Sequence, residues 1–144
     1  MQAIQFKNES IVEIATFLVR RWSGKDKTVI EISDKMETKT RLSENKVVLT
    51  PLEKRIGDNF QEYRQFRTSL WYEAMRIKFC KKILSNDHAF GFILNTMETL
   101  RIEQLGRKIW KGMDDEIIFN YAYMLVARPQ LNTVYGKARI VEAF

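Results

Sequence analysis

Residues 58–84 read DNFQEYRQFRTSLWYEAMRIKFCKKIL, and this run organises the rest of the chain. Its apolar residues recur at spacings of three and four, and Arg and Lys fall largely between them, which predicts one long amphipathic helix. We expect this helix to be the central element of the fold. Its apolar positions are Phe60, Tyr63, Phe66, Leu70, Trp71, Ala74, Ile77, Cys80, Ile83 and Leu84.

The segment before this run predicts one further helix. Ser10 with Glu13 three residues later has the pattern of a capping box, and apolar residues then recur at helical spacing. Gly24 follows as a stop signal, so residues 10–22 are predicted to be helical.

Three short segments between the two helices predict a small sheet. Residues 28–32 are rich in β-branched side chains. Residues 39–42 and 46–50 read as a hairpin around Ser43-Glu44-Asn45. We therefore expect a small antiparallel sheet near the N-terminus, packed on the long central helix.

The segment after residue 84 predicts further helices. Asn86 or Asp87 can cap a helix, and Gly106 or Gly112 allows it to break. Its apolar residues at helical spacing are Phe90, Ile93, Leu94, Met97 and Leu100. A capping box at residues 50–53 predicts a short helical turn ahead of the central helix.

A third long helix is predicted to begin near Asp114, and its apolar pattern contains Ile117, Ile118, Tyr121, Ala122 and Leu125. Pro129 separates it from a final helix that ends at residues 140–144. Together, these predicted helices and strands make an α+β chain that is mostly helical. Residues 1–144 are expected to form a single domain, either by itself or as the N-terminal part of a longer protein.

Composition narrows the class of protein. The chain has 144 residues, 45% of them apolar, which is enough for one core, and a net charge of +6. A single cysteine, Cys80, excludes an internal disulfide and reads as a small buried hydrophobe. The N-terminus has no signal-peptide pattern, and no apolar run is long enough for a membrane span, so we expect a cytoplasmic protein.

The central run carries a sequence related to the H-E-x-x-H motif of zinc peptidases. Tyr72-Glu73-Ala74-Met75-Arg76 keeps the Glu but has neither His. Phenol is a poor zinc ligand at neutral pH and guanidinium is a permanent cation, so we predict no metal, no cofactor and no catalytic residue. A metallohydrolase with atypical ligands is an alternative, and it would require stoichiometric zinc.

Arg76 has two interpretations. It could pair with Glu98 or Glu73 and hold two helices together where a metal would otherwise lie. Alternatively, all three charges lie on solvated faces and contribute little to stability. His88, the only histidine, follows Asp87 near a helix start, where an Asp cap beside an exposed His is favoured over an acid–base pair.

Basic residues interleaved with aromatic ones give a second functional alternative, a small basic nucleic-acid-binding protein. Such a protein would contact phosphates with basic side chains and stack bases on Phe and Tyr. The more ordinary interpretation is a solvated basic face opposite an apolar core. The candidate contacts are Arg64, Arg67, Lys78, Lys81 and Lys82.

The stretch Met97-Glu98-Thr99-Leu100-Arg101-Ile102-Glu103, followed by Trp110-Lys111-Gly112-Met113, resembles the LEDxRIE … yPG stretch of a known family. That family is the cobalt-chelatase T-subunit and nitric-oxide-reductase accessory type. Glu98, Arg101 and Glu103 match its motif, whereas Thr99 replaces an Asp and Met97 a Leu. Those proteins carry a zincin-like region ahead of a von Willebrand factor A domain and work with MoxR-class AAA+ ATPases.

The resemblance implies a zincin-like, non-catalytic domain that recognises a protein client or partner for such an ATPase system. An extended peptide would pair with a strand edge at residues 46–50. The binding groove above the long helix would be lined by Tyr72, Glu73, Arg76, Glu98 and Arg101.

Overall fold

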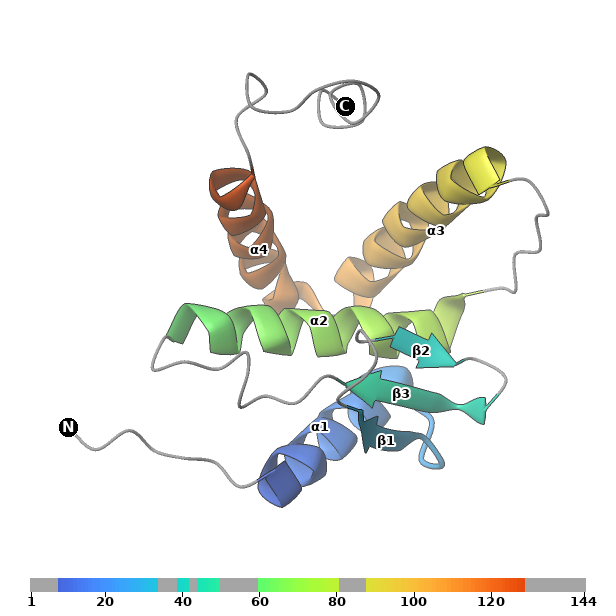
Figure 1. The fold of residues 1–144 in the computed structure, drawn as a ribbon, viewed down its shortest axis with the longest axis vertical. Helices are drawn as coiled ribbons and strands as arrows, with labels where there is room; N and C mark the ends of the chain where they lie inside the picture. Colours follow the sequence, from blue (N-terminus) through green and yellow to red (C-terminus); the bar gives the residue numbers. More distant parts are fainter. Residues whose placement is uncertain (1–7, 34–38, 42–43, 50–59, 81–87, 129–144) are drawn as a thin grey trace.

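The computed structural model describes residues 8–33, 39–41, 44–49, 60–80 and 88–128. These residues form four α-helices, one 3-10 turn and a three-stranded sheet (Figure 1). The prediction of a mostly helical α+β chain is therefore confirmed. None of the described helices combines the length and the apolar composition that a bilayer span requires.

Helix α1 spans Asn8–Ser23 and confirms the first predicted helix. The helix begins two residues before Ser10. Ser10 therefore lies inside the first turn, and the prediction that it caps the helix was wrong. Gly24 ends α1 with a φ of 70°, and its N–H donates to the Arg20 carbonyl at 2.9 Å. A side chain at this φ would be strained, which explains why the helix stops at a glycine.

The sheet contains β1 (Val29–Ile32), β2 (Lys39–Arg41) and β3 (Lys46–Leu49), in the order β1-β3-β2. β2 and β3 pair antiparallel, which confirms the hairpin, but β1 and β3 pair parallel. The prediction of an antiparallel sheet was wrong for this pair. The chain reverses direction between β1 and β2 and again between β2 and β3, so β3 runs in the same direction as β1. β3 then lies between β1 and β2 in the sheet.

This order also overturns the predicted peptide-binding edge at residues 46–50. β3 is hydrogen-bonded to a strand on each side, so the main chain of Lys46–Leu49 offers no open edge. Thr50 lies outside the described residues. Among the described strands, β1 and β2 are the outer ones.

Helix α2 spans Phe60–Phe79 and is the central element, as predicted (Figure 1). Its buried residues contact α1 and the inner face of the sheet on one side and η3 and α4 on the other. Residues 58, 59 and 81–84 of the predicted helix lie outside the described residues. The core consists of Ala15, Val19, Trp22, Ile30, Val47, Leu49, Leu70, Trp71, Ala74, Met75, Ile77, Met113 and Ile117.

Helix α3 spans His88–Ile109, the 3-10 turn η3 spans Lys111–Met113 and α4 spans Asp114–Ala127. The predicted start near Asp114 is confirmed. The predicted break falls at Gly112, inside η3, and not at Gly106. The turn predicted at residues 50–53 and the final helix predicted at residues 140–144 lie outside the described residues.

Helix α3 continues through Gly106 because this position touches α2. A Cβ at Gly106 would lie 2.5 Å from Cζ2 of Trp71 and 2.8 Å from Sδ of Met75. Real Cβ atoms essentially never approach other atoms so closely, so only glycine allows α3 to cross α2 here.

Helices α3 and α4 rise from α2 on the side opposite α1 and the sheet, and they diverge with distance from α2 (Figure 1). They meet near α2 through the contact of Tyr121 with Glu103 and through Arg107, whose Nε lies 3.7 Å from Asp114 Oδ1. We call α1, the sheet and α2 the base, and we call residues 88–100 of α3 and 117–127 of α4 the arms.

Candidate functional site

A buried carboxylate marks the junction at which α2, α3 and α4 meet. Glu103 on α3 is 6% exposed and accepts hydrogen bonds from the hydroxyls of Tyr72 on α2 and Tyr121 on α4. Arg107, one turn along α3, places Nη2 3.1 Å from Glu103 Oε1. A buried carboxylate needs such partners, and here they come from three helices.

The two tyrosines of this junction are held in their neutral form. Burial raises the pKa of Tyr72, and its hydrogen bond to Glu103 raises it further. Burial and the hydrogen bond to Glu103 also raise the pKa of Tyr121. A neutral phenol that already donates to a carboxylate has no proton available for a substrate. The junction therefore joins helices and lacks the features of an acid–base centre.

The sequence patterns did not predict that Tyr72, Glu103 and Tyr121 meet in one junction. Tyr72 was assigned to a binding groove, Glu103 to the resemblance motif and Tyr121 to the apolar pattern of its helix. The signal that could have identified it is a Glu among apolar helix positions, because such a residue must find donors when buried.

The predicted groove residue Arg76 lies at the crossing of α2 and α3. Its Nε is 3.9 Å from the carboxylate of Glu73, which is 9% exposed, and its Nη2 donates to the Thr99 hydroxyl at 3.4 Å. The pairing with Glu73 is thus present, but it joins residues of one helix. The contact that links two helices is the one with Thr99.

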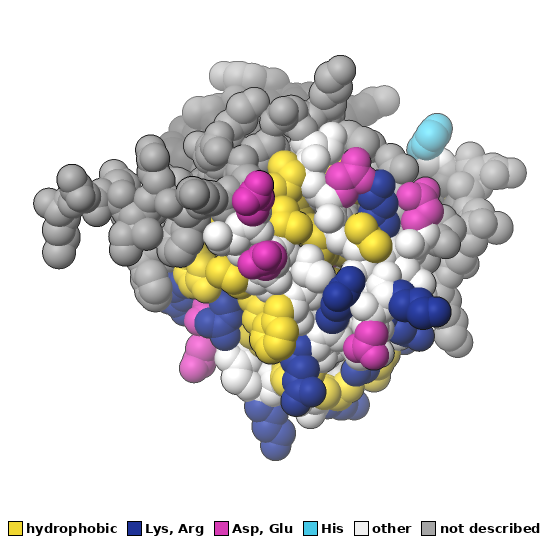
Figure 2. Space-filling model, turned by 90° about the horizontal axis from the view of Figure 1, so that it is seen from below, with side chains coloured by type: hydrophobic (Ala, Val, Ile, Leu, Met, Phe, Trp, Pro, Cys, Tyr) yellow, Lys and Arg dark blue, Asp and Glu magenta, His cyan; other side chains and the backbone are white. Residues whose placement is uncertain are grey.

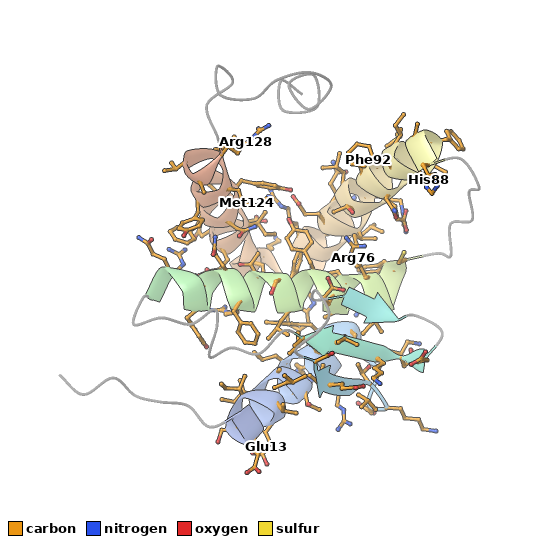
Figure 3. All side chains as sticks on the ribbon, viewed as in Figure 1. Glu13, Arg76, His88, Phe92, Met124 and Arg128 are labelled. Carbon is orange, nitrogen blue, oxygen red and sulfur yellow. The ribbon has the colours of Figure 1, made fainter. Side chains whose placement is uncertain are left out.

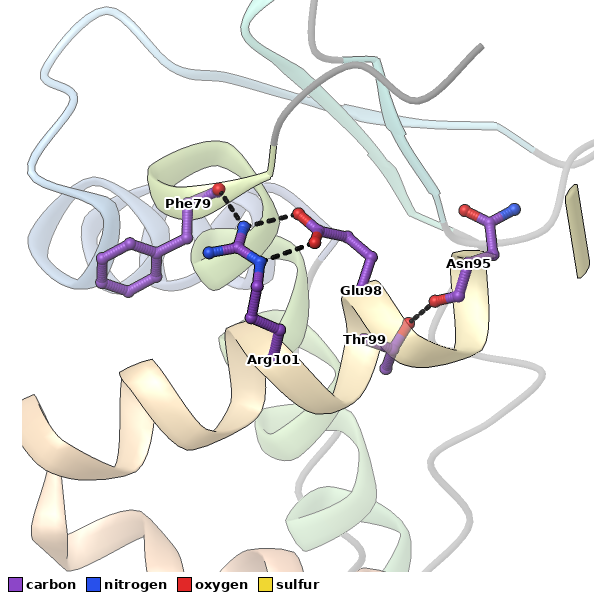
Figure 4. A network of polar contacts seen from close by, with 5 residues as sticks. All are labelled: Phe79, Asn95, Glu98, Thr99 and Arg101. Atoms are coloured by element: carbon purple, nitrogen blue, oxygen red, sulfur yellow. Dashed lines mark hydrogen bonds and ion pairs between the residues drawn. The ribbon is translucent and has the colours of Figure 1, made fainter. Parts of the chain in front are cut away.

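Glu98 and Arg101 form a separate polar network at the end of α2 (Figure 4). Arg101 donates to both carboxylate oxygens of Glu98 at 2.6 Å, and its Nη2 donates to the Phe79 carbonyl at 2.7 Å. Phe79 is the last residue of α2, so Arg101 satisfies one of the carbonyls that a helix end leaves open. The two charges serve the attachment of α3 to α2.

Cys80 lies directly after α2, beside the same network. Burial raises the pKa of its thiol, the Glu98 carboxylate raises it further, and Arg76 opposes the shift. A raised thiol pKa lowers the thiolate fraction at neutral pH, and thiolate is the reactive form. The arrangement disfavours Cys80 as a nucleophile, although its side chain is half-buried and not buried as predicted.

The five predicted groove residues therefore lie along one seam. Tyr72, Glu73 and Arg76 come from α2, and Glu98 and Arg101 from α3. Their contacts join α2 to α3 or α4, or join residues within one helix. Within the described residues, no group of three or more His, Cys, Asp or Glu is arranged to hold a metal ion.

Three of the candidate nucleic-acid contacts lie within the described residues, and these three do not share one surface. Arg64 pairs with Glu116 on α4 at 2.8 Å, and its guanidinium lies 3.7 Å from the ring centroid of Phe119. Arg67 turns toward η3, with Nη2 4.0 Å from Met113 Sδ. Lys78 lies on the side of α1, 3.9 Å from the position of a Cβ at Gly24. Lys81 and Lys82 lie outside the described residues.

The face of the base formed around α1 has charges of both signs among apolar side chains (Figure 2). A hollow of about 540 Å³ on α1 is lined by Phe17, Arg20 and Arg21 but also by Glu13 and Asp26. An anionic polymer such as nucleic acid would meet repulsion as well as attraction here. The hollow does not strengthen the nucleic-acid alternative.

The arms carry most of the exposed large apolar side chains. Ten of the fifteen in the described residues lie there, with exposed fractions between 39% and 88%. Figure 3 shows Phe92 near the outer end of α3 and Met124 near that of α4. His88, the first residue of α3, is exposed at the same outer end. The ten are Phe90, Phe92, Ile93, Met97, Leu100, Ile118, Tyr121, Met124, Leu125 and Val126.

The arms also contain almost no charge. Glu98, which pairs with Arg101, is the only Asp, Glu, Lys or Arg within residues 88–100 and 117–127. Patches of large exposed apolar side chains often mark binding sites on proteins. Among the described residues, the arms expose more large apolar side chains than any other region.

Comparison with known proteins adds no further assignment. No family model matches the chain, and neither a curated protein nor a solved structure matches it.

Proposed function

We propose that this chain is a protein-interaction domain whose binding surface is formed by the arms. The observation that carries the proposal is the concentration of ten exposed large apolar side chains on two helices that the base holds apart. Burying apolar area supplies the main driving force of association, roughly 25 cal/mol per Å² before the costs of binding. Of the core residues, only Ile117 lies within the arms, at the end of the α4 arm that adjoins the base.

The base suits the role of a rigid support. Trp71 and Met75 pack against Gly106 of α3, and Ile117 of α4 is fully buried in the core. The junction of Tyr72, Glu103 and Tyr121 then links both arms to α2 and to each other. Such anchoring fixes the orientation of the arms, which lowers the entropy lost on binding.

The narrower proposal, a client or partner domain of an AAA+ and von Willebrand factor A system, rests on the sequence resemblance alone. The Glu98, Arg101 and Glu103 side chains that carry the resemblance make contacts inside the molecule. They support the packing of α3, so the partner would have to recognise the neighbouring apolar residues.

A photo-crosslinking amino acid placed at Phe92 or Met124 tests the proposed function. We expect discrete covalent protein adducts, identified by mass spectrometry, from both arm positions. The matched control is the same amino acid at Phe17, which is 68% exposed but lies on α1. Equal labelling at all three positions, or unreacted chain alone at the arm positions, would contradict the proposal.

A further inference from the structure

The exposed side chains of the arms follow the spacing of a helix–helix seam. On α3, Ile93, Met97 and Leu100 are separated by four and three residues, and each is more than half exposed. On α4, Ile118, Tyr121 and Leu125 are separated by three and four residues. Alternating spacings of three and four are the pattern by which one α-helix packs against another. The surface that covers these rows is therefore expected to be helical.

The row on α3 lies away from the base. With 3.6 residues per turn, Ile93, Met97 and Leu100 fall on the side of α3 opposite Ile102 and Gly106, which are buried. In the described part of the chain, α3 and α4 are joined near α2 and separate beyond it, so neither arm packs along the other (Figure 1). The rows need helices from elsewhere.

We propose that a second copy of this chain supplies these helices, so that the arms of two copies pack against each other. This inference rests on the proposed function, since it names the partner of the same surface. The two arms have similar helical lengths, about 20 Å for 13 residues and about 16 Å for 11 residues. A two-fold arrangement would set each apolar row against rows of the same length and composition.

The charge distribution is compatible with self-association through the arms. The chain carries a net charge of +6, so two copies repel each other over most surfaces. The arms are the place where that repulsion is weakest, because their only charged residue is Glu98, already paired with Arg101. Charged residues that flank a helix–helix seam usually determine which partner a helix pairs with. The first two turns of the α3 row have no such residues.

The available area agrees with a stable dimer. The six side chains of the two rows, 39–64% exposed, offer roughly 600 Å² of apolar surface, and a specific interface buries about 800 Å² on each partner, of which a little over half is non-polar. A lipid surface is a poorer match, because helices that lie on membranes usually carry Lys or Arg along their polar face. The arms contain neither residue.

The test is the mass of the full chain in solution, measured by sedimentation velocity over a range of concentrations. We expect a dimer at micromolar concentration. The variant with Ile93→Glu and Leu125→Glu adds a charge to each row and should be monomeric, with unchanged helix content. Both positions are exposed, at 53% and 62%, so the fold of one copy should tolerate them. Phe17→Glu, at a 68% exposed site on α1, is the matched control and should stay dimeric.

A monomeric wild-type chain, or a dimer that survives both arm substitutions, would overturn the inference. A fluorescent dye that binds exposed apolar surface then separates the two proposals. If the monomer binds the dye and the double variant does not, the inference of a second copy is wrong, but the arms remain available to another protein. If neither binds it, the rest of the chain covers the arms and the proposed function fails as well.

Discussion

The base and the arms are built from similar residues at similar helical spacing, yet they differ in what covers them. In the base, Leu70 and Trp71 of α2 are fully buried because α1, the sheet, the end of α3 and the start of α4 surround them. In the arms, Leu100 and Leu125 are 52% and 62% exposed. The same spacing thus produces a core in one region and an open surface in the other. What distinguishes them is the number of neighbouring elements within the chain.

Truncation of a leucine in each region gives the largest expected difference. Leu70→Ala should lower the free energy of unfolding by about 2–5 kcal/mol, because it leaves a cavity in the core. Leu125→Ala should change it by no more than about 0.5 kcal/mol in dilute, monomeric protein. Urea denaturation followed by tryptophan fluorescence measures both values. Similar losses for the two variants would show that the arms belong to the same packed core.

The crossing of α3 over α2 is the next most sensitive point. Gly106→Ala places a Cβ against the buried Trp71 ring, and we expect a loss of about 1–3 kcal/mol in unfolding free energy. Gly112→Ala is the matched control, since a Cβ there meets nothing within 4 Å. Urea denaturation of the pair checks this. If both variants are equally stable, the close approach of the two helices is wrong.

The junction between base and arms predicts a dependence on alkaline pH. The pKa of Tyr72 is raised in the folded protein, whereas an unfolded tyrosine ionises near pH 10. Its contribution to stability is therefore complete below about pH 10 and is lost as the pH rises further, by up to about 1.4 kcal/mol per pH unit. Tyr72→Phe removes this group, so the alkaline fall in unfolding free energy should become shallower. An identical fall in the variant would contradict the buried network.

The smallest expected effect concerns Cys80. Because burial and Glu98 raise its pKa, alkylation at neutral pH should be slower in the folded protein than in the chain unfolded by urea. Mass spectrometry of samples quenched at intervals gives both rates. Faster alkylation of the folded form would mean that the seam of α2 and α3 activates the thiol.

The sequence predicted where the helices lie, but it did not predict which elements they pack against. The spacing of apolar residues predicted α1, α2, α3 and α4, because this periodicity is a local property. It also identified Phe90, Ile93, Met97 and Leu100 as one apolar pattern, but no local signal tells whether such a row faces its own chain or another. Their exposure is visible only in the three-dimensional arrangement.

Long-range contacts account for the errors. Gly106 looked like a helix break because the sequence does not show that Trp71 packs on it. Residues 46–49 looked like an open edge because the parallel pairing of β1 with β3 joins segments that are not adjacent in the sequence. Arg76 was expected to reach Glu98 or Glu73, and its contact with Thr99 on α3 was not anticipated. Each of these depends on which elements meet, which local patterns do not specify.

Hydrogen exchange followed by mass spectrometry, at low and at high protein concentration, tests the central claim most directly. We predict that amides of the base, such as those at residues 68–77, are protected equally at both concentrations. Amides at residues 88–100 and 117–127 should exchange faster in dilute protein and gain protection only when the protein is concentrated. Protection of the arms that is independent of concentration and equal to that of the base would contradict the account.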